Sequence, residues 1–439
     1  MSLANSAMGI VEWLESAVDS KTGGKLIRER FNLATMSWIS RYRIDCAIEA
    51  ALSFLKAWQY TGDTKYLSLA RDLYNGVLSI QHENGSFPYH TGSAIEYTND
   101  NSEVAIFLLR MADIDSEYAY KYRNTALQIT DWLVSIQYDD GSWRRSSETF
   151  SRTACFTAHA VSALSMAYKY TINRSAYKTA IENGLAFIGS KILDSGMVEL
   201  MGANEAQRPP SSDQSICVRG IAHAELYVDD LDNRETWTAN RHILLSWLAQ
   251  LVTDEGSVMN GLGQGANGAD TVNVTDYVYT LPFTIEAFYH SYCVDDDSEL
   301  LETALKIVRF AQSNIYYARS SPSGVLRGAF NIADRNWDTS DAFLDGGQQG
   351  GGDMVYTGWT NAPIATHLFS FDHLLGNKAI LSFFANNKAV RIANKDGGAV
   401  KVFTNGETIS FPVTSETSPD ASPVKIYANG RKQALAFTM

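Results

Sequence analysis

The sequence predicts an all-α protein, an (α/α)6 toroid of six helical hairpins followed by a small antiparallel β appendage. Three observations lead to this fold. Glycine-bearing loops recur at near-constant spacing, amphipathic helical segments precede them, and segments that are apolar on almost every side follow them. One ring of buried helices inside a second ring of amphipathic helices accounts for all three observations.

The repeat is clearest in two loops of similar sequence, QHENGSFPYH (81–90) and QYDDGSWRR (137–145), each of which follows Ser-Ile. Related loops occur along most of the chain, and the intervals between successive loop glycines are 61, 56, 55, 60 and 68 residues. The glycines are Gly24, Gly85, Gly141, Gly196, Gly256 and Gly324. Six loops at this spacing predict six repeated units.

The segments before the loops have the pattern of amphipathic helices with one solvent-exposed face. In segment 64–81, apolar residues such as Leu67, Ala70 and Leu73 recur every three or four positions, with Lys and Arg between them. The same pattern occurs in 120–137, 175–192, 235–252 and 299–315. These segments are therefore expected to form the outer ring.

The segments after the loops are apolar almost all round, as expected of helices buried on every side. They are 44–58, 102–112, 153–168, 215–228, 278–292 and 361–375. An open helical solenoid is the alternative fold, but it would not require its inner helices to be apolar on every face.

The character of the chain changes after about residue 377. Short β-branched runs at 389–395, 399–406, 408–415 and 423–430 are separated by Gly, Asn and Pro, which indicates a small antiparallel β structure. We therefore divide the chain into a toroid, 1–376, expected to be the catalytic domain, and a β-rich appendage, 377–439.

Composition excludes several classes of function. The formal charge of −13 argues against nucleic-acid binding, and no apolar run reaches the length of about 18 residues that spans a bilayer. The first ten residues lack the pattern of a secretory signal, so we expect a cytoplasmic protein unless a leader has been removed. The four cysteines are far apart and are expected to be reduced. Nothing in the sequence points to a cofactor or a metal, and the oligomeric state stays open.

In a toroid of this kind the six loops meet at one end, where the N-termini of the inner helices direct their free N–H groups and positive dipole ends. This mouth is the expected site, and the residues that open each inner helix are its expected lining. Aromatic side chains, arginines and carboxylates recur there, a combination that suits sugars, because rings stack on pyranose faces and Arg binds a uronate carboxylate. For each arginine, pairing with a neighbouring aspartate is the alternative.

The candidate residues follow from these positions. The expected general acid and base carboxylates are Asp100, Asp213 and Asp276. The expected substrate-binding residues are Trp38, Arg41, Arg152, His159, Arg219, His223, Tyr277 and Trp359. The long glycine-rich loop 320–357 is interpreted either as a flap over the mouth or as a plain insertion.

Two motifs resemble known families built on helical toroids. Segment 132–143, WLVSIQYDDGSW, resembles the QW repeat of squalene and terpenoid cyclases, where the repeat clamps helices together. Segment 213–228, DQSICVRGIAHAELYV, resembles the fourth inner helix of unsaturated glucuronyl and rhamnogalacturonyl hydrolases. The second resemblance implies that an inner-helix aspartate, here Asp100, protonates an unsaturated uronide before water adds.

These observations predict a carbohydrate-active enzyme, a glycoside hydrolase that acts on an acidic, uronate-containing oligosaccharide or polysaccharide. A polysaccharide lyase is one alternative, in which His159 or His223 acts with Tyr277 as base and acid. A glycan-binding or assembly protein without catalytic activity is another alternative, and a terpenoid cyclase-like protein is the third.

Overall fold

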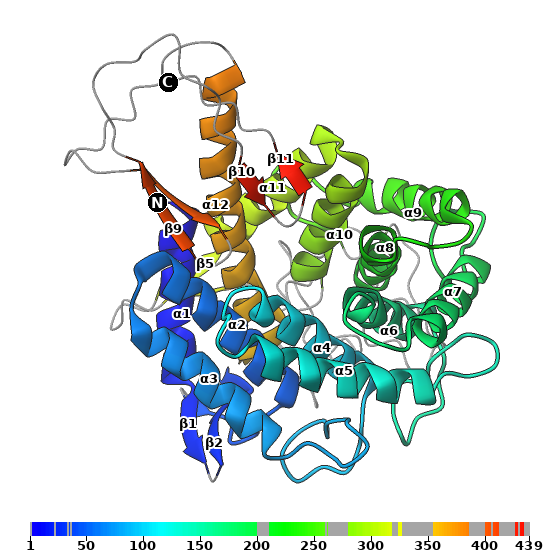
Figure 1. Ribbon diagram of the computed structural model, residues 1–439, viewed down its shortest axis with the longest axis horizontal. Coiled ribbons are helices and arrows are strands. Elements are labelled where there is room, and N and C mark those ends of the chain that lie inside the picture. Colours follow the sequence, from blue (N-terminus) through cyan, green and yellow to red (C-terminus); the bar gives the residue numbers. More distant parts are fainter. Residues whose placement is uncertain are drawn as a thin grey trace. The chain divides into compact units, whose positions relative to one another are not determined.

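The computed structural model describes residues 2–21, 23–32, 35, 37–199, 210–259, 261, 280–317, 324–326, 354–385, 400–404, 407–411, 426–428 and 431–433. By its internal contacts the chain divides into two units, Met1–Phe369 and Ser370–Met439. The first unit is an (α/α)6 toroid, so the predicted fold class is confirmed (Figure 1).

Helices of the described chain alternate between an outer and an inner position (Figure 1). The outer helices are α1 (Leu3–Ser16), α3 (Thr64–Leu78), α5 (Ala119–Ser135), α7 (Arg174–Ser190), α9 (Arg234–Ala249) and α11 (Ser298–Ser313). The inner helices are α2 (Ile44–Thr61), α4 (Thr98–Ala112), α6 (Ala154–Ala167), α8 (Pro210–Tyr227), α10 (Thr280–Asp295) and α12 (Ala362–Ala385). Every residue of α6 is buried, whereas α3 buries only one face, as their sequence patterns predict.

Four of the predicted loops fold into the same tight turn. The glycine N–H donates to the carbonyl three residues earlier, at 3.0 Å for Gly85, 2.9 Å for Gly141, 2.8 Å for Gly196 and 3.0 Å for Gly256. All four glycines have a φ between 82° and 91°, a region that side chains with a Cβ rarely adopt. The loop after α1 differs, because strands β1 (Val18–Lys21) and β2 (Gly24–Ile27) form a hairpin there.

The first and last repeats meet and close the ring. Strand β3 (Arg30–Asn32) pairs with β4 (Ser37–Trp38) on one side and with β7 (Met354–Tyr356) on the other. The Ser53 hydroxyl of α2 donates to the Ala362 carbonyl at the start of α12, at 2.7 Å. A kinked turn, Thr357–Asn361, with non-helical backbone at Gly358 and Trp359, leads from β7 into α12. These contacts join segments more than 300 residues apart and exclude an open solenoid.

The remaining strands form short antiparallel pairs. Strand β5 (Ile315–Tyr317) pairs with β6 (Gly324–Leu326). In the second unit, β8 (Val400–Thr404) pairs with β9 (Glu407–Phe411) and β10 (Ile426–Ala428) with β11 (Arg431–Gln433). The division expected at 376/377 falls inside α12, which continues through Ala385. Of the predicted strand segments, 389–395 lies outside the described residues.

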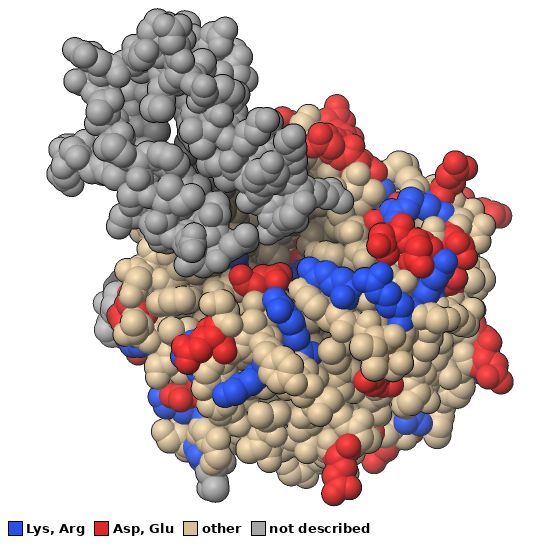
Figure 2. Space-filling view, in the orientation of Figure 1, with Lys and Arg blue, Asp and Glu red and all other residues tan. Residues whose placement is uncertain are grey.

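Two further properties of the described part concern function. No helix within the described ranges is both long and apolar enough to cross a membrane. Figure 2 shows a band of Lys and Arg side chains across one face of the molecule, with Asp and Glu side chains scattered around it. The net negative charge is therefore not spread evenly over this face.

Candidate active site

The first cluster of the site lies where α2 and α4 begin. Arg43 is the N-cap residue of α2, and its guanidinium binds the Asp45 carboxylate through two nitrogens, at 2.6 and 3.0 Å. Its Nη2 also lies 3.0 Å from Oδ1 of Asp100, in the first turn of α4. Burial alone would lower the pKa of Arg43, but the charges of Asp100 and Asp45 raise it well above its usual value. We call Arg43, Asp45 and Asp100 the acid centre.

Two aromatic rings flank the guanidinium of the acid centre. The Trp359 ring centroid lies 3.7 Å from Cζ of Arg43, and the Tyr89 ring centroid lies 4.2 Å from it. Trp359 also donates its indole N–H to Asp45 at 2.7 Å, while the Tyr89 hydroxyl accepts from Arg43 at 2.7 Å. Burial raises the pKa of Tyr89 to about 12. Both rings are partly exposed, and such rings provide stacking surfaces for a ligand.

Trp359 is held in a strained backbone conformation. Its φ is 54°, which is a true outlier for a bulky residue, and it lies inside the kinked turn. A Cβ on the preceding Gly358 would approach the Glu49 carboxyl to 2.4 Å and the Cys46 sulfur to 2.6 Å, so only glycine fits there. Trp359 donates its backbone N–H to Glu49 at 2.5 Å. Burial, with the nearby Asp45 charge, raises the pKa of Glu49 well above its usual value.

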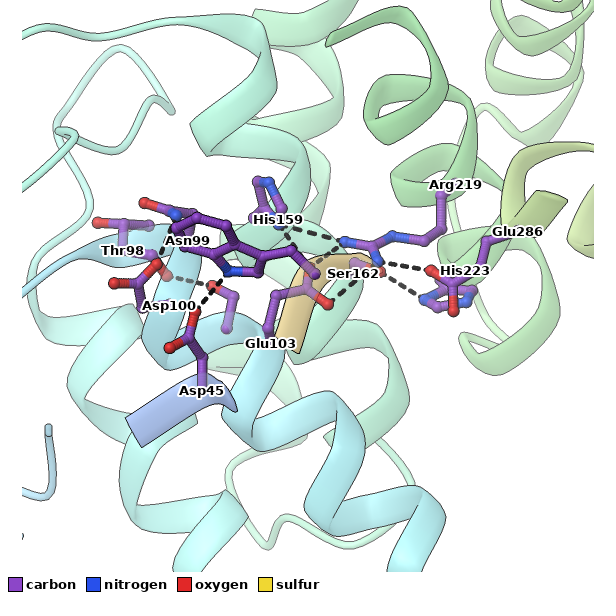
Figure 3. Close-up of polar contacts among 12 residues, drawn as sticks. Asp45, Thr98, Asn99, Asp100, Glu103, His159, Ser162, Arg219, His223 and Glu286 are labelled. Atoms are coloured by element: carbon purple, nitrogen blue, oxygen red, sulfur yellow. Dashed lines mark hydrogen bonds and ion pairs between the residues drawn. The ribbon is translucent and has the colours of Figure 1, made fainter. Parts of the chain in front are cut away.

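A chain of buried charges continues along the inner helices, and Figure 3 shows its central part. Arg219 of α8 binds Glu103 of α4, with Nη1 at 3.2 Å, and Glu286 of α10 at 2.7 Å. Arg110 of α4 binds the other oxygen of Glu286 at 2.6 Å, and His159 of α6 donates to Glu103 at 2.6 Å. We call these five residues the axial network.

The charge state of this network follows from its pairing. Burial would raise the pKa of Glu103, but Arg219 and His159 lower it to about 2. Burial would likewise raise the pKa of Glu286, which the charges of Arg110 and Arg219 instead hold well below its usual value. Both carboxylates are therefore ionised at neutral pH inside the ring.

A group of neutral histidines lies beside the axial network. The His223 ring is hydrogen-bonded to the Ser162 hydroxyl at 2.5 Å and to the His290 ring at 2.7 Å. Burial, together with the neighbouring cations, lowers the pKa of His290 to about 3 and that of His367 to about 4. The pKa of His223 is lowered well below its usual value for the same reasons. Neutral imidazoles of this kind can accept a proton.

Five residues predicted from the sequence come together in this region. They are Asp100 in the acid centre, His159 and Arg219 in the axial network, and His223 beside that network (Figure 3), together with Trp359, whose ring stacks on Arg43 of the acid centre. The role expected of Arg219 needs correction: its side chain is 0% exposed, and Glu103 and Glu286 occupy its guanidinium, so it does not present a free fork to a substrate carboxylate.

Other predicted residues lie outside this cluster. Arg41 forms a bidentate ion pair with Glu29, and Arg152 lies at the surface, 2.9 Å from Asp140. Trp38 packs in β4 against Trp13 and Phe31, with ring centroids 5.1 Å apart in both pairs. Arg41 and Arg152 therefore each pair with a protein carboxylate, which was the alternative to substrate binding. Asp213 lies buried in the first turn of α8, near Cys217.

The predicted residues Asp276 and Tyr277 lie outside the described residues, as does most of the loop 320–357. Within the described residues, no three His, Cys, Asp or Glu side chains are grouped in a way that could hold a metal ion.

The sequence reasoning did not select several residues that are central to the site. They are Arg43, Asp45, Glu49, Glu103, Arg110, Glu286, His290 and His367. One signal would have found most of them: each inner segment carries ionisable residues within an otherwise apolar helix. A buried charge in such a helix needs a partner, and the ionisable residues of the other inner helices are the natural candidates.

Comparisons with known proteins support the fold. No protein-family model and no curated protein matches the sequence. Among solved structures, the chain is similar to cellobiose 2-epimerase from Bacillus thermoamylovorans, with a TM-score of 0.59 and 10% identity over 84% of this chain and 99% of that one. It is also similar to a D-mannose isomerase, with a TM-score of 0.61 and 11% identity over 85% and 97%.

A third similar structure is an inactive variant of an α-1,6-mannanase from Salegentibacter in complex with α-1,6-mannotriose. Its TM-score is 0.58, with 11% identity over 85% of this chain and all of that one. Its variant replaces two consecutive aspartates by asparagines. At these identities the similarity shows a shared (α/α)6 toroid and nothing further.

Proposed function

We propose that this protein is a carbohydrate-active enzyme that hydrolyses a glycosidic bond at the acid centre. The observation that carries the proposal is the pair of carboxylates, Asp45 and Asp100, held on one guanidinium of Arg43 between the rings of Trp359 and Tyr89. Carboxylates beside partly exposed aromatic rings are the groups that glycoside hydrolysis requires. The names of the similar structures, a mannanase, a cellobiose epimerase and a mannose isomerase, support a sugar as the substrate.

The pairing of the arginines favours a neutral sugar over the uronate expected from the sequence. Arg41, Arg43, Arg152 and Arg219 each bind a protein carboxylate. Their charges are already balanced, so the argument from several free arginines to an acidic glycan no longer holds. Uronate-bearing substrates are included in the experiment below, and their turnover is the competing outcome.

Glycoside hydrolysis requires one carboxylate and one carboxylic acid. Asp100 lies 3.0 Å from the Arg43 guanidinium, and we assign it the role of the carboxylate that attacks the anomeric carbon or activates water. Glu49, whose pKa burial raises well above its usual value, lies one helical turn from Asp45 on α2, and it is the proposed source of the proton for the leaving oxygen. Both Asp45 and Asp100 contact the same Nη2, at 2.6 and 3.0 Å, so their bound oxygens lie closer than the roughly 6.5 Å at which inverting pairs begin.

The test is an assay of released reducing ends with neutral and uronate-bearing oligosaccharides of equal length, including α-1,6-mannotriose, and with nitrophenyl glycosides. Asp100→Asn should lower kcat by at least about 100-fold, because it removes the reacting carboxylate. Asp139→Asn, an exposed aspartate on the loop after α5, is the matched control and should retain activity. Full activity of the Asp100→Asn variant, or turnover confined to uronates, would contradict the corresponding part of the proposal.

A second candidate, sugar epimerisation or isomerisation, is favoured by the neutral histidines. His290 and His367 stay unprotonated well below pH 7, and a neutral imidazole can remove the proton next to a sugar carbonyl. Proton NMR in deuterated water separates the two reactions. Loss of the C2 proton signal of mannose or cellobiose, without release of new reducing ends, would identify an epimerase or isomerase and exclude hydrolysis.

The remaining alternatives make different predictions. A terpenoid cyclase would need an apolar interior, whereas the described interior contains Glu103, Arg219 and Glu286 as ions. A lyase would act through Tyr277, which lies outside the described residues. A purely glycan-binding protein would be stabilised thermally by oligosaccharides but would turn over none of the substrates above.

A further inference from the structure

A rim hairpin stands directly on the helix that carries Asp100. Residues 144 to 152, between α5 and α6, form an antiparallel bridge between Arg144 and Arg152, and Arg145 donates its N–H to Ser151 at 2.8 Å. Thr98, the first residue of α4, donates its N–H to the Arg145 carbonyl at 3.0 Å and its hydroxyl to the Arg144 carbonyl at 2.6 Å. Two bonds therefore fix the hairpin at the mouth, two residues from Asp100.

A second set of bonds ties this hairpin to the preceding mouth loop. The Ser147 N–H donates to the Glu96 carbonyl at 2.9 Å, and the Glu96 N–H donates to the Ser147 hydroxyl at 3.1 Å. Tyr97 forms an isolated bridge with Ser146. The hairpin is thus a built part of the mouth and holds its side chains in defined positions.

The tip of this hairpin presents Phe150 to solvent, with 66% of its surface exposed. A single exposed ring is common on protein surfaces, but this ring stands on an anchored hairpin beside the start of α4, where it can stack on a ligand. The Arg144 guanidinium lies 6.0 Å from its ring centroid. Arg144 is itself partly exposed, so its N–H groups can reach hydroxyl oxygens of a ligand.

Further aromatic rings and a guanidinium group lie between this hairpin and the acid centre. Arg145 lies 5.8 Å from the Tyr97 ring centroid, and the Tyr97 and Tyr89 centroids are 4.9 Å apart. Tyr89 flanks Arg43, as described above. The exposure of the side chains falls toward the acid centre: Phe150 is exposed, Tyr97 and Tyr89 are partly exposed, and Asp100 is only 6% exposed.

We propose that Phe150, Tyr97 and Tyr89 form an aromatic track that binds a neutral oligosaccharide chain whose reacting unit lies at the acid centre. The inference rests on the proposed function and adds to it that the substrate is a chain longer than a disaccharide. Aromatic faces bind the C–H faces of successive sugar units, and the arginines between them donate to hydroxyl oxygens. Phe150 is then a specificity residue that contacts a distal sugar unit and takes no part in the chemistry.

The test measures KM and kcat of the full chain on a nitrophenyl monoglycoside and on neutral α-1,6-manno- and cello-oligosaccharides of three to six units. Phe150→Ala should raise KM about three- to tenfold for the longest oligosaccharides, leave kcat unchanged, and have no effect on the monoglycoside. Phe150→Trp should restore the low KM. Tyr120→Ala, which removes an aromatic ring that is 80% exposed on outer helix α5, is the matched control and should change nothing.

The outcomes separate the track from the proposed function. An equal rise in KM for the monoglycoside and the hexasaccharide, or no change for either, would overturn the track while leaving hydrolysis intact. If no sugar is turned over, calorimetric titration with the same oligosaccharides tests the track alone. An affinity that grows with chain length in the natural protein and falls in Phe150→Ala would support the track and overturn hydrolysis. Absence of such binding would overturn the track as well.

Discussion

At the scale of single residues, the fold depends on buried charges, each of which is paired with an opposite charge. Arg219 has no exposed surface, and its guanidinium satisfies Glu103 on α4 and Glu286 on α10. Removing an ion from water is costly, and in this network each charge is tolerated because an opposite charge lies within hydrogen-bond distance. The network therefore fixes the relative positions of three inner helices more strictly than apolar side chains would.

Replacing Arg219 by Met should lower the free energy of unfolding by about 3–5 kcal/mol, because it leaves two buried carboxylates without their shared cation. Urea unfolding followed by far-UV circular dichroism measures the change. Arg152→Met is the control: Arg152 and Asp140 are each 45% exposed, so this variant should stay within about 0.5 kcal/mol of the natural protein. A loss below about 1 kcal/mol in Arg219→Met would show that the axial network does not support the ring.

At the scale of elements, three of the loop glycines, Gly85, Gly141 and Gly256, pack closely against the next outer helix. A Cβ on Gly85 would lie 2.6 Å from a carbonyl oxygen of α5, one on Gly141 2.3 Å from a carbonyl oxygen of α7, and one on Gly256 2.4 Å from a carbonyl oxygen of α11. The Gln137 side chain strengthens the same contact by donating to the carbonyls of Gly141 and Ala180. The repeated sequence pattern thus encodes the contact between successive hairpins.

Two glycine substitutions distinguish backbone strain from this close contact. Gly141→Ala and Gly62→Ala both place alanine at a positive φ, 84° and 75°, but a Cβ at Gly62 would meet nothing within 4 Å. Both should lose about 1 kcal/mol from strain, and Gly141→Ala should lose a further 1–3 kcal/mol or so from the clash with α7. Chemical denaturation of the two variants makes the comparison. Equal losses of stability would mean that backbone strain alone accounts for the effect and that the contact between hairpins does not contribute to stability.

At the scale of the toroid, the ring encloses ionisable groups rather than a purely apolar core. Pairing of β3 with β7 and the bond from Ser53 to Ala362 close the ring, so the inner helices contribute side chains to one shared interior. His290 of α10 and His367 of α12 lie near the cations Arg110 and Arg219, and burial among them keeps both imidazoles neutral. Acid is therefore expected to act on the stability of the whole ring.

Stability should fall as the pH is lowered from 6.5 toward 4. The pKa of His367 is lowered from 6.5 to about 4, so below pH 6.5 the unfolded chain takes up a proton that the folded chain does not. This group alone can remove as much as about 3 kcal/mol over that interval. Between pH 4.5 and 2 the loss continues, because Glu103, with its pKa lowered to about 2, is protonated in the unfolded chain first.

Urea midpoints measured from pH 8 to pH 4 check this expectation. His367→Gln should flatten the dependence between pH 6.5 and 4, while His242→Gln, whose side chain is 52% exposed, should leave the slope as it is. A slope that is the same in His367→Gln as in the natural protein would contradict the assignment.

The sequence by itself determined the periodic part of this protein. Local sequence patterns were sufficient for this part. Glycines at positive φ mark the loops, and the apolar pattern separates outer helices, which bury one face, from inner helices, which are buried all round. The six units and the toroid could be predicted from these patterns. Loop positions also predicted which end of the ring to search, and Asp100, His159, Arg219, His223 and Trp359 do meet there.

Only the tertiary structure decided which charges neutralise one another. The partners of Arg219 are 116 and 67 residues away, and those of Trp359 lie at the other end of the sequence, on α2. Such pairings depend on the rotation of each inner helix about its axis, which a nearly all-round apolar pattern leaves unspecified. An arginine that is free to bind a substrate and one that is already paired look the same in sequence. Hence the sequence predicted that Arg41, Arg152 and Arg219 bind substrate, whereas in the structure each of them pairs with a protein carboxylate.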